Sequence, residues 1–212
     1  MGGHIPHLFG AHYFLPNENH HFISSESDSY YYEVYIGKQS ISVNRGDCVY
    51  MINSDKKSAA LVRGAAKINS EHFAVLIRGY APENKTSSIT NGTVLPYVNG
   101  CSTKQIFPPD RPGDPTLQML HIPPYSSEQV HHIHSTTRAV YVLSGEGKSV
   151  VGMKDKSFAH PLTPGTVAVL ERMCPHHFET GDQGLVVLPV HVWSSVPSAE
   201  HNHPMFNGTF TM

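Results

Sequence analysis

Residues 131–147 place two histidines, one residue apart, ahead of an apolar strand that ends at Gly145-Glu146-Gly147. Alternate side chains of a β-strand share a face, so His132 and His134 point to one side and Ile133 to the other. Two imidazoles held close together on one face suit a borderline divalent metal ion. The spacing therefore predicts a strand that carries part of a metal site.

A second stretch complements the first. Thr163-Pro164-Gly165 predicts a turn, residues 166–170 predict a strand, and Pro175-His176 follows after a short interruption. Over roughly residues 115–195 the chain resembles the cupin superfamily, whose first motif is an H-x-H followed by a Glu and a Gly. The second cupin motif is a Pro-Gly followed by a Pro-His. Gly145, Gly165 and Pro175-His176 stand at the distances that these motifs require.

The resemblance implies an all-β fold, the double-stranded β-helix or cupin jelly-roll barrel, holding one metal ion. The ligands that it implies are His132, His134 and His176. Most cupins carry a ligating Glu where this chain has Arg138, and an arginine cannot ligate a metal. Three interpretations stay open. The site is a three-histidine site, as in the gentisate and thiol dioxygenases, which we favour; or Glu128 supplies a carboxylate; or the histidines are structural and no metal binds.

Composition limits the class of protein and its partners. A net charge of −2 over 212 residues gives no electrostatic case for nucleic acid or an anionic membrane. Seventeen glycines and 16 prolines are typical of many short strands joined by turns. The three cysteines lie far apart, and residues 1–7 lack the pattern of a signal peptide. We therefore expect a cytoplasmic protein without a disulfide framework.

The N-terminal part of the chain resembles the cupin pattern more weakly. An aromatic strand at residues 30–37 and a turn at Arg45-Gly46-Asp47 resemble cupin elements, but Lys57 stands where a histidine would be. The fold is therefore predicted to include a degenerate bicupin, and an unrelated β extension is the alternative. The predicted organisation is a degenerate cupin-like β half at 1–80, a Pro/Gly-rich connection at 81–116, the metal-binding barrel at 117–195 and a polar tail at 196–212.

Three neutral histidines would not offset the charge of the metal ion, and they would leave several of its coordination positions open. That arrangement suits an Fe(II) oxygenase and an anionic chelating substrate. Arg138, a fixed cation beside the ion, is predicted to bind a substrate carboxylate. The alternatives are that Arg138 pairs with Glu128 or Glu171, or that it turns to solvent.

The sequence thus predicts a metal-dependent cupin enzyme. By resemblance it is an Fe(II) dioxygenase acting on a small carboxylate-bearing or phenolic compound, with Mn, Ni or Zn as the other candidate ions. The catalytic residue is not identified, and the candidates are Arg138, Tyr125 and Glu128. Alternatives are a non-catalytic ligand-binding cupin, or a metal-dependent isomerase or lyase whose base is Tyr125, Tyr141 or Glu128. By analogy with other cupins we expect a homodimer.

Overall fold

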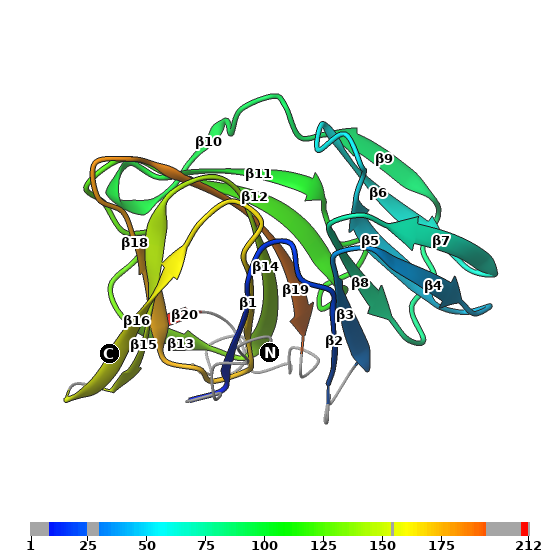
Figure 1. Ribbon diagram of the computed structural model, residues 1–212, viewed down its shortest axis with the longest axis horizontal. Coiled ribbons are helices and arrows are strands. Elements are labelled where there is room, and N and C mark those ends of the chain that lie inside the picture. The colour runs from blue at the N-terminus through cyan, green and yellow to red at the C-terminus, as the bar shows by residue number, and fades with distance from the viewer. Residues whose placement is uncertain (1–8, 25–29, 154, 194–208, 212) are drawn as a thin grey trace.

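The computed structural model describes residues 9–24, 30–153, 155–193 and 209–211. Over these residues the chain forms β-strands and one short 3-10 helix at Val98–Gly100, and no helix in them is long and apolar enough to cross a membrane. Figure 1 shows two β halves side by side, with the C-terminal half forming a barrel. The all-β prediction is confirmed.

Two sheets face each other in the C-terminal half. One contains seven strands, in the order β1 (Ala11–Phe14), β17 (Val167–Leu170), β14 (Thr136–Gly145), β19 (Leu185–Trp193), β12 (Thr116–Ile122), β11 (Ser102–Phe107) and β10 (Leu95–Pro96). The other contains five, in the order β16 (Lys156–Leu162), β15 (Gly147–Met153), β18 (His176–Glu179), β13 (His132–His134) and β20 (Thr209–Thr211). Alternate residues such as Val140, Val142 and Leu170 join one buried cluster with Phe178 and Leu162 of the second sheet, as expected of a jelly roll.

The N-terminal half is a smaller sandwich. Its six-stranded sheet has the order β2 (His20–Ile23), β3 (Tyr32–Ile36), β8 (Phe73–Ile77), β5 (Cys48–Ile52), β6 (Ser58–Arg63) and β9 (Lys85–Ser88). A two-stranded sheet of β4 (Gln39–Val43) and β7 (Ala66–Ser70) covers one face of it. The other face packs on the seven-stranded sheet, where the rings of Phe73 and Tyr141 lie 5.7 Å apart between centroids. One continuous apolar core therefore joins the two halves.

Two segments belong to other parts of the structure than the predicted organisation implies. Strand β1 lies within residues 1–80 but pairs with β17, in the sheet of the C-terminal half. Residues 81–116, predicted as a connection, contain β9, β10 and β11, so they extend both sheets. The Ser and Thr residues of this segment suit strands that are half exposed. The prolines and glycines around them led to the prediction of a connection instead. Of the predicted tail, only β20 lies within the described residues, and the cupin-repeat origin of the N-terminal half stays a prediction.

Gly145, the glycine of the first motif, ends β14 with a φ of 80°. A Cβ atom added there would lie 1.9 Å from the carbonyl oxygen of Gly184. Gly145→Ala is therefore expected to lower the free energy of unfolding by about 2–4 kcal/mol, because both the conformation and the space exclude a side chain. Chemical denaturation measures this loss. Gly181→Ala is the matched control, since a Cβ atom there meets nothing within 4 Å. Equal losses in the two variants would contradict the prediction.

Candidate metal centre

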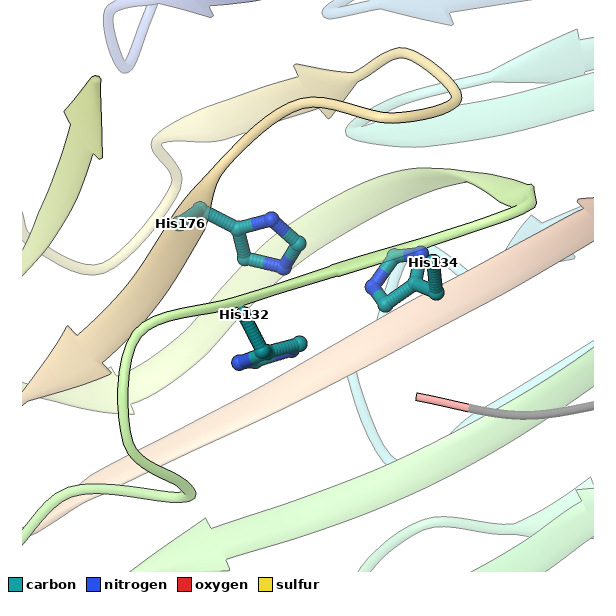
Figure 2. Close-up of side chains that lie close together, drawn as sticks. All are labelled: His132, His134 and His176. Carbon is teal, nitrogen blue, oxygen red and sulfur yellow. The ribbon is translucent and has the colours of Figure 1, made fainter. Parts of the chain in front are cut away.

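Three histidines meet inside the C-terminal half. Strand β13 supplies His132 and His134 from the same face, and β18 begins at His176, which lies opposite His132 in the register. Their exposed fractions are 0%, 4% and 0%. Figure 2 shows the three rings directed toward one another from the two strands. The ring centroids are 4.6–5.4 Å apart, and one nitrogen from each ring lies within 4.8 Å of the other two.

Backbone carbonyl groups fix the orientation of each ring. The Nδ1 atoms of His132, His134 and His176 lie 2.9, 3.0 and 2.8 Å from the carbonyl oxygens of Val130, Thr136 and Cys174. Because a carbonyl only accepts, each Nδ1–H must donate, and the lone pair is then on Nε2.

All three Nε2 atoms are buried and have no hydrogen-bond partner within the described part of the chain. Burying an unpaired polar atom is costly, and three such atoms directed at one point would be unusual without a ligand. A divalent cation would accept all three lone pairs, and the backbone carbonyls would then play the usual role of outer hydrogen-bond partners. The donor set therefore fits a metal ion.

The charge state of the histidines agrees with this role. Burial lowers the pKa of His132 to about 4 and holds the pKa values of His134 and His176 well below the usual range, and the charge of Arg138 lowers all three further. The imidazoles are consequently neutral at neutral pH, the form that ligates metal. In the described residues, the group able to hold an ion comprises these three histidines and no carboxylate, so Glu128 is not a fourth member.

Arg138 lies on β14 opposite His191 of β19, so the two side chains share a face of the sheet. The sequence could not orient His191, because the strand contains Pro189 and its parity was open. Arg138 alternates with Val140 and Val142 of the barrel cluster, so both side chains face the barrel interior, and the charge of Arg138 lowers the pKa of His191 as it does those of the three histidines.

Two of the predicted alternatives for Arg138, pairing with Glu171 or with Glu128, are not what the structure contains, and the residue is partly exposed. Glu171 is paired with His12, at 3.2 Å between Oε1 and Nε2. Glu128 accepts a hydrogen bond from the backbone N–H of Phe178 instead. The Nε atom of Arg138 is buried and unpartnered, and the side chain forms no hydrogen bond or ion pair with any described residue. Its hydrogen-bonding capacity is therefore left for another group.

The remaining candidates are placed differently. Glu128 is 3% exposed, and burial raises its pKa to about 7, although the Phe178 N–H and the charge of Arg138 oppose that rise. Tyr125 is 79% exposed and lines a surface hollow with Ser126 and Glu179, so the structure does not bring it to the histidines. Tyr141 packs against Phe73 between the two halves, on the face of the sheet away from the barrel interior.

Residues 118–192 match the model of the family described as the cupin domain. With both motifs in place on a jelly roll, this part of the chain is a cupin domain.

Several solved structures resemble it. The polyketide cyclase RemF from Streptomyces resistomycificus is 24% identical over 49% of this chain and 72% of that one, with a TM-score of 0.41. A cupin 2 conserved barrel domain protein from Leptotrichia buccalis is 18% identical over 84% and 90%, with a TM-score of 0.48. A predicted oxalate decarboxylase from Thermotoga maritima is 18% identical over 48% and 90%, with a TM-score of 0.39. No curated protein matches. No conclusion about function follows from likenesses at this level.

Proposed function

We propose that this chain is a metal-dependent cupin enzyme, an Fe(II) dioxygenase of the three-histidine kind that acts on a small carboxylate-bearing or phenolic compound. The observation that carries the proposal is the convergence of three buried, unpartnered Nε2 atoms. Mn, Ni and Zn are the other ions that such a donor set accepts. Ferrous iron, when bound, supplies the redox chemistry that dioxygen requires.

The residues of the chain have distinct roles in this proposal. His132, His134 and His176 hold the ion, each kept in position by its Nδ1–H and a backbone carbonyl. Arg138 binds the substrate carboxylate, because its side chain faces the barrel interior and has no partner among the described side chains. The apolar walls of the barrel exclude water from the bound substrate, as Val140 and Leu170 are buried there.

Two further parts of the proposal rest on general features. A cytoplasmic location agrees with three cysteines that are all buried and free of disulfides. A homodimer is proposed from analogy with other cupins, and size-exclusion chromatography with light scattering would test it.

Oxygen uptake by iron-loaded protein tests the activity. We expect about one iron per chain after expression in iron-supplemented cells, and uptake of oxygen with at least one compound from a panel of aromatic and thiol acids. Zinc-loaded protein is the control and should consume none. Compounds that bind without oxygen uptake would favour the non-catalytic ligand-binding cupin. Turnover without oxygen would favour an isomerase or lyase, for which Glu128 is the best placed of the three candidate bases because it is buried within reach of the charge of Arg138.

A further inference from the structure

Glu128 is a buried carboxyl group with one free oxygen. Its Oε2 atom accepts a hydrogen bond of 2.5 Å from the backbone N–H of Phe178, two residues after His176 on β18. Its Oε1 atom is buried and unpartnered, as is the Nε atom of Arg138. These two buried polar atoms, in addition to those of the three histidines, are available to a second ligand group.

Arg138 connects this carboxyl group with the metal centre. Arg138 alternates along β14 with Val140 and Val142, which are buried inside the barrel, and its charge acts on the three histidines and on Glu128. Yet Arg138 and Glu128 form no ion pair, although no other described residue occupies either free atom. Both free atoms are therefore available to a third group.

The free atoms define the chemistry of that group. The Nε–H of Arg138 only donates, so its partner must be an acceptor. A carboxyl group on Glu128 can donate from Oε1 when it is protonated, whereas an ionised Glu128 would repel an anion. One anionic oxygen pair can therefore satisfy both atoms only if Glu128 carries a proton, and burial of Glu128 favours that form.

We propose that Arg138 and Glu128 together form an anion subsite, in which Glu128 binds the substrate carboxylate as the neutral acid, so that binding to protein with an ionised Glu128 takes up one proton from solvent. This inference rests on the proposed function, since it describes how the same site recognises its substrate. It also narrows the predicted substrate class to anions that reach the metal centre while their carboxylate is bound to Arg138.

The groups that surround Glu128 are compatible with this linkage. The titratable or charged neighbours that act on it or respond to its charge are Arg138 on β14, Tyr97 before the 3-10 helix and Cys101 after it. From β18 it meets the N–H of Phe178, on the strand that carries His176. Burial raises the pKa values of Tyr97 and Cys101, so both stay neutral near pH 7 and neither can replace Glu128 as the proton acceptor.

Acetate binding to zinc-loaded protein, followed by NMR, tests the proposal. Zinc is redox-inert and keeps the three histidines from titrating, and acetate stays ionised between pH 6 and pH 8.5. With a pKa of about 7 for Glu128, the dissociation constant should rise about 30-fold across that range. The amide signal of Phe178 reports the ionisation of Glu128 directly, and acetate should move its titration midpoint to higher pH.

Glu128→Gln is the matched variant, because an amide keeps the hydrogen bond from Phe178 and can donate to an anion at every pH. We expect it to bind acetate with an affinity that does not change with pH, and its Phe178 signal should not titrate. A dissociation constant that is constant in the original protein, or that rises equally in the variant, would overturn the proposal. Zinc content measured on the same samples distinguishes failure of the Glu128 proposal from failure of the metal site. The acetate titration tests the anion subsite whether or not zinc is bound.

Discussion

Replacing His176 with alanine is expected to lower the affinity for divalent metal by more than about 100-fold, so that the purified variant carries almost none. The ring provides one of three converging Nε2 atoms, and no carboxylate is grouped with them in the described residues to take its place. Elemental analysis of freshly purified protein measures the change. His132→Ala and His134→Ala are expected to behave in the same way, because the three rings are equivalent in burial and orientation.

His177→Ala is the matched control. His177 follows His176 on the same strand but points away from the site, where its Nδ1 atom lies 2.8 Å from the Nδ1 atom of His131. Loss of this side chain should leave the metal content unchanged. Full metal in all three site variants would show that the histidines serve the structure alone, and the proposed function would then be wrong.

Replacing Arg138 with methionine is expected to have two opposite effects. Zinc should bind about tenfold more tightly, because the guanidinium charge disfavours positive charge on all three histidines, as their lowered pKa values indicate. For a carboxylate substrate, kcat/KM should fall about 100-fold, since the variant has lost a charge-assisted hydrogen-bond donor in a buried site. Zinc competition with a chromophoric chelator and steady-state kinetics measure the two quantities.

Two further variants sharpen this test. Arg138→Lys keeps the charge, so its zinc affinity should stay near that of the original protein, while the loss of the planar guanidinium should still weaken substrate binding. Arg63→Met removes an exposed arginine of the N-terminal half and should change neither quantity. Weaker zinc binding in Arg138→Met would mean that this residue supports the metal site, contrary to the prediction.

The parts of the site that could be predicted from sequence are those in which local periodicity defines the geometry. Strand alternation places His132 and His134 on one face, and the structure has them there. Arg138 lies on the next strand, β14, where its position follows from the spacing of the first motif. The jelly-roll fold was also predictable, because the two motifs stand at the spacing that the cupin resemblance requires.

Other parts depend on contacts that are distant in sequence. Tyr125 and Glu128 lie on one loop with no periodic pattern, yet one is exposed and the other buried. His191 lies beyond a shift in the register of β14 and β19 and two residues after Pro189, which has no N–H group. The face of the sheet to which His191 points could therefore not be derived from the sequence. The pairing of β1 with β17 joins residues that have no local signal for each other.

The position of β1 bears on the order in which the chain folds during synthesis. The strand at Ala11–Phe14 has no partner until Val167–Leu170 has been synthesised, whereas β2 to β9 pair with one another within residues 20–88. The N-terminal sandwich thus has all its partners soon after it leaves the ribosome, whereas the seven-stranded sheet closes over a long loop. The sandwich becomes the surface on which that sheet assembles, and the exposed edge of β1 is the part that translation leaves unpaired longest.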